Sequence, residues 1–285
     1  MRKVLITGAN GQLGSRLSEL VLPDEASVVV CDRKLLDVTN SASIQEALDK
    51  FEPEVVINAA AYTAVDRAEE EAELARAVNS TGVGHLARIC SAKGIDLIHV
   101  STDYVFSGDQ NEPYRTNDAP APTGVYGDSK WEGEKAIAEA FLGATQSQFW
   151  IFRVAWLYDS RGQNFAQTML RLGASGKALK IVDDQLGAPT AAGPLASMLM
   201  EVAQNPKLLN PGMWHYGTLG PATWYDFAMA IFAHKKMDVD ATPCGSDAYP
   251  TPAKRPAYSY LDPHPLMQAL GRSPQHWKDQ MQQVL

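Results

Sequence analysis

Cysteines are scarce in this chain, and long apolar runs are absent. The three cysteines among 285 residues, Cys31, Cys90 and Cys244, are too widely spaced for a disulfide framework or a zinc site. We therefore expect each to be a small buried side chain in a reducing compartment. No apolar run approaches the roughly 18 residues of a membrane span, and the run after Lys3 is too short for a signal peptide. We predict a cytoplasmic protein that makes no membrane contact.

Basic side chains are also in short supply. Lys and Arg number 25 against 33 Asp and Glu, which gives a net charge of −8. Nonspecific binding to nucleic acid depends on Lys and Arg that neutralise phosphates, so we expect no nucleic-acid partner. A hydrophobic fraction of 45% is that of an ordinary globular protein, and 285 residues predict one or two domains.

The first half of the chain alternates short apolar runs with amphipathic segments. Runs rich in β-branched and aromatic residues predict strands at 4–6, 27–31, 55–57, 97–100 and 149–154. Helical spacing predicts helices at 41–50, with Ser41 as the cap, and at 75–93, closed by Gly94. Apolar strands that alternate with helices indicate a parallel sheet covered on both faces. We predict an α/β fold with a doubly wound sheet of the Rossmann type.

The second half has a different texture, because ten of the 17 prolines follow residue 205. We predict a dinucleotide-binding domain over 1–153 and a smaller α/β substrate lobe over 154–285. Helical stretches at 192–203 and 224–233 are separated by loops rich in Pro and Gly. The run 179–183 is also strand-like. Its return to the first sheet would give the first domain further segments near 178–204, and the domain boundary would then be discontinuous.

Glycines at 8, 11 and 14 follow the first predicted strand and open a helix. Such glycines permit a tight turn and let backbone amides approach a pyrophosphate, which the helix N-terminus attracts. The pattern predicts a dinucleotide cofactor. Asp32 follows the second predicted strand, where an acid would hold the adenosine ribose. Arg33 comes next and would suit a 2′-phosphate, so the residues leave NADH and NADPH both open.

A tyrosine and a lysine stand four residues apart at Tyr126 and Lys130. On a helix this spacing puts both on one face, where the ammonium would lower the pKa of the phenol toward the working range. Thr102 ends the fourth predicted strand, and ligands of open parallel sheets bind at such carboxyl ends. Thr102 would then hydrogen-bond a substrate carbonyl beside Tyr126. The alternative interpretation is that Thr102 is only a structural hydroxyl at the end of a strand.

In this order, the motifs resemble the extended short-chain dehydrogenases/reductases. Within that group the chain is similar to the dTDP-4-dehydrorhamnose reductase family. The matching stretches are 8–14, 58–69, 101–106, 126–130, 152–158, 164–172, 184–190, 223–228 and 253–256. The resemblance implies that NADPH or NADH reduces the 4-keto group of dTDP-4-dehydro-β-L-rhamnose, or of another dTDP-4-keto-6-deoxy sugar. It also implies a monomer or a homodimer.

The resemblance implies roles for named residues. Tyr126 would protonate the keto oxygen, Lys130 would tune Tyr126 and hold the nicotinamide ribose, and Thr102 would polarise the ketone. The predicted cofactor contacts are Gly8, Asn10, Gly11, Gln12, Leu13, Gly14, Asp32, Arg33, Asp37, Val38, Ala59, Ala60, Ala61, Tyr62, Thr63, Tyr126 and Lys130. The predicted substrate contacts are Val65, Thr102, Asp103, Tyr126, Trp156, Asn164 and Arg255.

The chain departs from several related patterns. Sugar-nucleotide dehydratases carry Thr-Asp-Glu, whereas this chain has Thr102-Asp103-Tyr104, which argues against dehydration. Epimerases recycle a tightly bound NAD, whereas we expect the cofactor to exchange at each turnover. A non-catalytic relative, the regulatory subunit of methionine adenosyltransferase, also binds NADP, but the Thr102, Tyr126 and Lys130 set is complete here. Some members bind magnesium through a glutamate where this chain has Arg16, so we predict no metal.

The acidic net charge bears on the substrate, because both expected ligands carry a pyrophosphate. The positive charge that attracts these pyrophosphates must therefore come from local groups and not from the net charge of the protein. For the cofactor, the helix that follows Gly11 supplies it. For the sugar nucleotide, we predict a basic spot in the second lobe, with Lys254 and Arg255 as the candidates.

Overall fold

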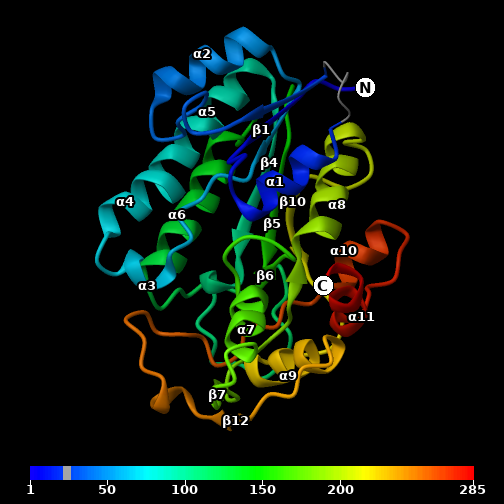
Figure 1. Cartoon of the computed structure of the whole chain (residues 1–285). Coiled ribbons are helices and arrows are strands. Elements are labelled where there is room, and N and C mark those ends of the chain that lie inside the picture. The colour runs from blue at the N-terminus through cyan, green and yellow to red at the C-terminus, as the bar shows by residue number, and fades with distance from the viewer. Residues whose placement is uncertain (22–26) are drawn as a thin grey trace.

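The main sheet of the protein has six parallel strands in the order β10-β5-β4-β3-β1-β2 (Figure 1). The computed structural model describes residues 1–21 and 27–285. The strands are β1 (Val4–Thr7), β2 (Val28–Cys31), β3 (Val55–Asn58), β4 (Asp96–Thr102), β5 (Phe149–Val154) and β10 (Gly212–Tyr216). The first five are the predicted runs. The Rossmann-type doubly wound fold is therefore confirmed.

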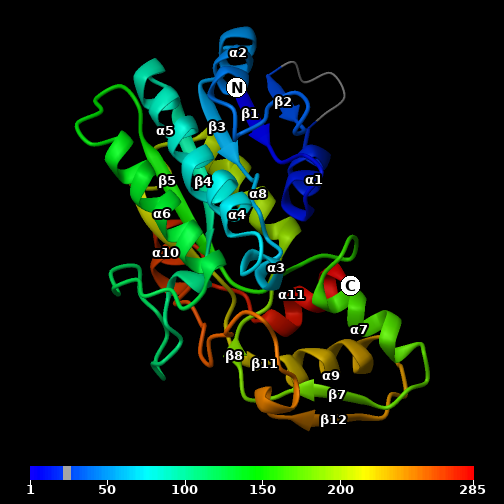
Figure 2. The same ribbon diagram turned by 90° about the vertical axis from the view of Figure 1, so that its left-hand side faces the viewer.

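Helices cover both faces of this sheet (Figure 2). Successive residues of a strand point to opposite faces, so Leu5 packs in one core and Ile6 in the other. The helices of the Leu5 face are α2 (Ser41–Phe51), α5 (Gly82–Lys93) and α6 (Val125–Ala140). The helices of the Ile6 face are α1 (Gln12–Glu19) and α8 (Ala192–Gln204). Burial on both sides explains why the strand sequences are almost continuously apolar.

Two of the predicted helices differ in detail. The side chain of Asn40, and not that of Ser41, caps α2 by accepting from the amides of Ala42 and Ser43. The predicted helix 75–93 comprises the end of α4 (Ala72–Arg76), a π-helical segment η1 (Ala77–Thr81) and α5. Gly94 ends α5 at a φ of +70°, as expected of a C-terminal glycine. Inserted π turns are frequent at functional sites, and Asn79 of η1 hydrogen-bonds the backbone of Tyr62 after β3.

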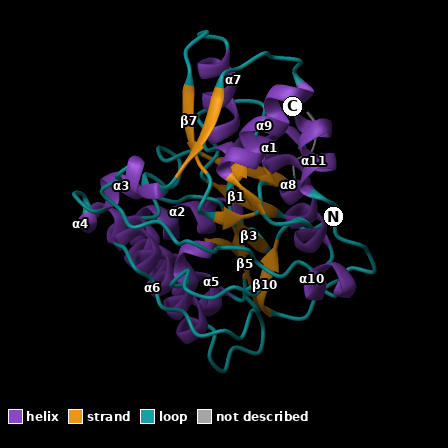
Figure 3. Ribbon diagram, turned by 90° about the horizontal axis from the view of Figure 1, so that it is seen from below, coloured by secondary structure: helices purple, strands orange, loops and turns teal. Residues whose placement is uncertain are grey.

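The second lobe is built from short elements around their own apolar core, which includes Phe227, Ile231 and Trp277. Its strands pair as β7 (Leu179–Val182) with β12 (Ala241–Cys244), β6 (Leu157–Tyr158) with β9 (Thr190–Ala191), and β8 (Leu186–Gly187) with β11 (Ala222–Thr223). Its helices are α7 (Phe165–Gly173), α9 (Trp224–His234) and α11 (Trp277–Val284), whereas α10 (His264–Ala269) packs against β10 in the core of the main sheet. Seen from below, β7 lies apart from the strands of the main sheet (Figure 3).

The prediction that residues 179–183 return to the first sheet is wrong, because β7 pairs with β12. The element that does return is β10, which pairs with β5, and α8 packs against α1. The difference has a physical reason: Lys180 of β7 is exposed, whereas strands of the main sheet are buried on both sides. The sequence of β10 contains no β-branched residue, so its propensity is weak. The domain boundary at residue 153 stays a prediction.

Burial tests the expectation for the three cysteines. Cys31 and Cys90 are buried as expected, but Cys244 is only half-buried, at the end of β12. In the part of the chain that the structure describes, no helix is both long and apolar enough to cross a membrane.

Candidate active site

The glycine loop brings backbone close to backbone. Gly8 has a φ of +72°, and a β-carbon there would lie 2.6 Å from the amide nitrogen of Ala60. A β-carbon on Gly14 would lie 2.0 Å from the carbonyl oxygen of Gly8. Helix α1 starts after Gly11 without any side-chain cap, so its first amides are not satisfied by a side chain. Bare amides at a helix start suit a pyrophosphate, so this loop fits the predicted dinucleotide.

A cavity of about 290 Å³ opens beside the glycine loop. Eleven of the predicted cofactor contacts line it: Gly8, Asn10, Gly11, Asp32, Arg33, Asp37, Val38, Ala59, Ala60, Ala61 and Tyr62. The sequence interpretation missed five further lining residues: Ala9, Leu36, Thr39, Leu74 and Val78. Among the predicted contacts outside this lining, Leu13 is buried in the core and Thr63 lines a second cavity. Glycines and alanines of the loops after β1 and β3 make up much of this lining, so a ligand can approach the backbone there.

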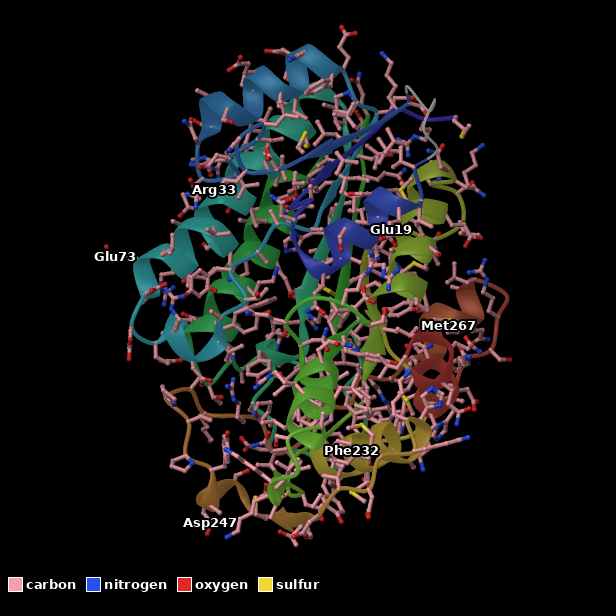
Figure 4. The ribbon with its side chains drawn as sticks, viewed as in Figure 1. Glu19, Arg33, Glu73, Phe232, Asp247 and Met267 are labelled. Carbon is pink, nitrogen blue, oxygen red and sulfur yellow. The ribbon has the colours of Figure 1, made fainter. Side chains whose placement is uncertain are left out.

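The acidic residue after β2 is already engaged by its own loop. Oδ1 of Asp32 accepts from the amides of Lys34 and Leu35, each at 3.0 Å. Arg33 forms an ion pair with Asp37 at 3.2 Å, and its side chain is largely exposed on the surface of the first lobe (Figure 4). Hydrogen bonds from Thr39 hold the pKa of Asp37 below its usual range. An acid and an arginine therefore stand at one cavity rim, which suits both a ribose hydroxyl and a 2′-phosphate.

Thr102 and Tyr126 meet at the carboxyl end of β4. The Thr102 hydroxyl lies near the Tyr126 phenol, whose pKa it lowers, and donates to Oδ1 of Asp103 at 2.9 Å. Burial raises the pKa of Tyr126 above its usual value, so the phenol stays protonated. Tyr104 contacts the Tyr126 ring edge-on, with centroids 5.5 Å apart. A half-buried, protonated phenol beside a hydroxyl is suited to donate a proton to a carbonyl oxygen.

Lys130 occupies the next turn of α6 but does not act on Tyr126 as expected. Its Nζ lies 3.1 Å from Nε2 of His99 and donates to the carbonyl of Val100 at 2.7 Å. The predicted lowering of the Tyr126 pKa by Lys130 is wrong for this structure, because burial outweighs every other influence on the phenol. Burial also lowers the pKa of Lys130 to about 8. With a pKa of about 8, Lys130 still carries its charge for most of the time at pH 7.

Asp103 is a buried carboxyl group in the same cluster, with an exposure of 2%. Burial raises its pKa to about 6, although hydrogen bonds, the first of them from Thr102, act in the opposite direction. Its position beside Thr102 and Tyr126 makes it part of the polar surface that a bound ketone would meet.

A second cavity of about 560 Å³ lies between the two lobes of the chain. Its lining residues are Thr63, Val65, Tyr104, Phe165, Thr168, Met169, Leu172, Leu179, Lys180, Ile181, Val182, Gln185, Trp224, Tyr249, Thr251 and Arg255. Tyr62 lines the first cavity and Thr63 the second, so the two cavities adjoin after β3. Tyr104 connects the second cavity to Tyr126. The predicted catalytic residues Thr102, Tyr126 and Lys130 themselves line neither cavity.

Trp156 stands in a strained backbone conformation with a φ of +49°. Its ring stacks on Trp224 with centroids 3.5 Å apart and planes 9° apart. The indole of Trp224 donates to Gln185 at 3.0 Å, which fixes the outer ring. A β-carbon on Gly187 would lie 2.6 Å from Cε2 of Trp156, so the glycine leaves room for the stack. The pair forms a rigid aromatic wall next to the second cavity.

Arg255 lines the second cavity and forms an ion pair with Asp66 at 2.6 Å. Its second nitrogen donates to the Tyr104 hydroxyl at 3.2 Å. Lys254, the other candidate for the basic spot, is exposed and is not among the lining residues. The cavity wall instead includes Lys180 as its second cation.

The remaining predicted contacts have structural partners. Asn164 caps α7 by accepting from the amide of Gln167, and it donates to Gln12 at 3.0 Å. This bond ties the start of α1 to the second lobe. Arg16 makes a two-pronged ion pair with Asp159, close to that bond. Among the described residues, no group of three His, Cys, Asp or Glu side chains is arranged to hold a metal ion.

The sequence interpretation missed three buried polar residues around this site. Asn79, in η1, binds the backbone of Tyr62 through both its oxygen and its nitrogen, and donates to Ser129 at 3.1 Å. Asn58 and His99 bridge β3 and β4 at 3.0 Å. A polar side chain inside an apolar strand sequence was the available signal, since burial of such a group requires a partner.

A glycine-rich loop suited to a dinucleotide, together with a half-buried tyrosine and a buried lysine one helical turn apart, defines a Rossmann-type oxidoreductase. The model of the RmlD substrate binding domain matches residues 1–285, and the chain belongs to this family. The dTDP-4-dehydrorhamnose reductase of Aggregatibacter actinomycetemcomitans is 38% identical over 100% of this chain and 98% of its own. The spore coat polysaccharide biosynthesis protein SpsK of Bacillus subtilis is 33% identical over 100% of this chain and 97% of its own.

A solved structure supports the same grouping. The crystal structure of dTDP-4-dehydrorhamnose reductase from Bacillus anthracis, in complex with NADP, matches with a TM-score of 0.91 at 35% identity. The match covers 99% of this chain and 98% of that chain. Both lobes are therefore shared with that protein.

Proposed function

We propose that the chain is an NADPH- or NADH-dependent reductase of dTDP-4-dehydro-β-L-rhamnose, with dTDP-L-rhamnose as its product. Full-length relatives that carry the name dTDP-4-dehydrorhamnose reductase support the reaction. The observation that carries the proposal for this chain is the position of Tyr126 beside Thr102 at the carboxyl end of β4, linked through Tyr104 to the second cavity. The first cavity lies beside the glycine loop, and the second, of about 560 Å³, offers room for another ligand.

The reaction needs a proton at the keto oxygen. A reduced nicotinamide, when bound, supplies hydride to the carbonyl carbon. Tyr126 donates its phenolic proton to the developing alkoxide, and its raised pKa keeps that proton available. Thr102 hydrogen-bonds the same oxygen and orients it toward Tyr126. Because both groups are fixed before the charge develops, they stabilise the transition state more than the ketone.

The cofactor would be held along the first cavity. Amides at the start of α1 would bind the pyrophosphate, and Asp32 or Arg33 would meet the adenosine ribose or its 2′-phosphate. Lys130 would donate to the nicotinamide ribose. The NADP named for the Bacillus anthracis structure favours NADPH as the first cofactor to test.

The sugar nucleotide would occupy the second cavity. Arg255 and Lys180 supply the local positive charge that an acidic protein needs for a diphosphate. Trp156 and Asp103 would contact the sugar beside Tyr126. Val65 lines the same wall, whereas Asn164 would act through Gln12, to which it donates.

Turnover can be measured by the loss of nicotinamide fluorescence when the dTDP-4-keto sugar is added to the protein with NADPH or NADH. NMR of the product then gives the configuration at C4. We expect dTDP-L-rhamnose and an exchangeable cofactor. A 6-deoxytalose product would overturn the substrate assignment but keep the reductase chemistry. Tight NADPH binding without turnover would instead favour the non-catalytic regulatory alternative.

Two further expectations remain open. The cytoplasmic location stays a prediction, and so does the choice between a monomer and a homodimer. Retention of the cofactor through purification would count against the exchange expected of a reductase and would favour an epimerase-like cycle.

A further inference from the structure

A cluster of charged side chains joins α1, the helix after the glycine loop, to the second lobe. Nε of Arg16 donates to Oδ2 of Asp159 at 2.5 Å. Nη2 of Arg16 donates to Oδ1 of the same carboxylate and, at 2.9 Å, to the hydroxyl of Ser160. Asp159 directly follows β6 and is only 2% exposed. At the rim of the cluster, Glu19 of α1 pairs with both Arg16 and Arg161.

A second contact between the same segments lies one turn closer to the glycine loop. Gln12 precedes Arg16 by one turn of α1, and its Oε1 accepts from Nδ2 of Asn164 at 3.0 Å. The same nitrogen lies 3.0 Å from the carbonyl oxygen of Asp159, and Oδ1 of Asn164 caps the start of α7. We refer to Gln12 and Arg16 on one side, with Asp159 and Asn164 on the other, as the interlobe clasp.

Helix α7, which lies below α1 in Figure 1, begins directly after Asn164 and forms one wall of the second cavity. Residues three and four positions apart share a helix face. Four residues of one such face line the cavity: Phe165, Thr168, Met169 and Leu172. The Phe165 ring also packs on Trp224, with centroids 4.6 Å apart, and Trp224 stacks on Trp156. The placement of α7 relative to α1 therefore shapes this cavity and its aromatic wall.

The clasp connects two separate hydrophobic cores. Leu17 of α1 is buried in a core of the main sheet, whereas Met169 of α7 is buried in the core of the second lobe. Apolar packing is not directional, whereas the two-pronged contact of an arginine with a carboxylate fixes both distance and orientation. The clasp can thus set how α7 sits on α1 more precisely than the two cores do.

We propose that Asp159 and Asn164 are positioning residues for the sugar nucleotide: held by Arg16 and Gln12, they fix the α7 wall of the second cavity. None of these four residues lines either cavity, so they act through α7 and not by contact with the ligand in the second cavity. The inference rests on the proposed function for the identity of that ligand. The attachment of α7 to α1 does not depend on it.

Hydrogen exchange, followed by mass spectrometry in the full-length protein, measures this attachment without any ligand. Asp159→Asn removes the charge that Arg16 binds but keeps an oxygen for the amide of Ser160, which donates at 2.6 Å. Arg16→Gln removes the guanidinium and leaves that bond in place. We expect the amides of α7 to exchange about three- to tenfold faster in both variants. Unchanged exchange would overturn the proposal, and Arg16→Gln decides if the two disagree, because it alters no residue of the loop before α7.

Calorimetry with dTDP and with NADPH shows which cavity the clasp serves. We expect dTDP to bind about three- to tenfold more weakly in each variant, whereas NADPH affinity stays within about twofold. KM for the sugar nucleotide should rise by the same factor with kcat nearly unchanged, because Tyr126 keeps its place. Unchanged dTDP affinity, or an equal loss for both ligands, would contradict the positioning role. A wild-type protein that binds no dTDP would refute the proposed function, and the exchange of α7 would then decide the attachment.

The double variant Arg16→Gln/Asp159→Asn tests whether the two residues act as one pair. Its loss of dTDP affinity should equal that of either single variant, since each already breaks the same ion pair. Losses that add up would show two independent effects and would count against the clasp.

Asp96→Asn is the matched control. Asp96 is also a buried aspartate paired with an arginine, Arg2, at 2.6 Å, but it lies at the start of β4 and lines neither cavity. We expect this variant to leave α7 exchange and dTDP affinity unchanged although it breaks an ion pair too. Changes of equal size in the control would assign the effect to general loosening and refute the proposal.

Discussion

Nη2 of Arg255 lies 2.6 Å from Oδ2 of Asp66, although 189 residues separate them in sequence. The pair joins α3 (Val65–Ala68) of the first lobe to a late loop of the second, at the wall of the second cavity. Asp66 thus holds the guanidinium in place before any ligand binds. A pre-oriented arginine loses less freedom when it binds a diphosphate, so it contributes more affinity.

Replacement of Arg255 by alanine should weaken binding of the sugar nucleotide by about ten- to a hundredfold, because a charge-assisted hydrogen bond is lost. Cofactor affinity should be nearly unchanged, since Arg255 lies outside the first cavity. Calorimetry with each ligand measures both values. Lys254→Ala is the matched control, because this neighbouring cation is exposed and does not line the cavity. An equal loss of affinity for both ligands in Arg255→Ala would point to a folding defect.

Replacement of Tyr126 by phenylalanine should lower kcat by about 10²- to 10⁴-fold, the usual contribution of a positioned proton donor. The ring and its edge contact with Tyr104 are kept, so affinity for both ligands should persist. Single-turnover oxidation of NADPH isolates this step. Tyr104→Phe removes a hydroxyl that binds Arg255 and should alter KM more than kcat. Full activity in Tyr126→Phe would show that another group supplies the proton.

The parts of the site that could be predicted from sequence are those with a local pattern. The glycines of the first loop and the four-residue spacing of Tyr126 and Lys130 follow from backbone geometry alone. The strands were predictable because burial on both faces demands apolar residues in succession. The Arg255–Asp66 pair has no such pattern, because it depends on how two lobes pack.

Polar residues inside apolar strands were harder to interpret. His99 lies in the run Leu97 to Val100, where an apolar pattern predicts a strand but says nothing about the partner of the imidazole. That partner is Lys130, which comes from α6. Likewise, the effect of Lys130 on Tyr126 was inferred from spacing, whereas the actual influence depends on burial and on where Nζ points. Sequence spacing fixes which residues are near each other but not their proton states.

Asp103 should make the stability of the protein depend on pH. Its pKa is about 6 when folded and about 3.8 when exposed, so the unfolded chain releases this proton at lower pH than the folded chain. Stability therefore falls as pH rises from about 4 through 6, and the loss approaches the order of 3 kcal/mol above pH 7. Asp103→Asn cannot lose the proton and keeps an oxygen that accepts from Thr102.

Urea unfolding at pH 5 and pH 8 tests whether the stability falls with rising pH because of Asp103. The Asp103→Asn variant should gain free energy of unfolding relative to wild type at pH 8 and gain less at pH 5. Asp109→Asn replaces an exposed side chain and should give the same difference from wild type at both pH values. A gain for Asp103→Asn that is larger at pH 5 than at pH 8 would contradict the raised pKa.

Substitution of Gly187 by alanine should displace the Trp156–Trp224 stack, because the new methyl group would lie 2.6 Å from Cε2 of Trp156. A sugar that leans on this wall would then be misplaced relative to Tyr126, and a shift of about 1 Å can lower the rate by about a hundredfold. We expect kcat/KM for the sugar nucleotide to fall by about ten- to a hundredfold and NADPH affinity to persist. Gly193→Ala is the matched control, since its β-carbon would meet nothing within 4 Å. If both variants keep wild-type kcat/KM, the stacked tryptophans do not position the substrate.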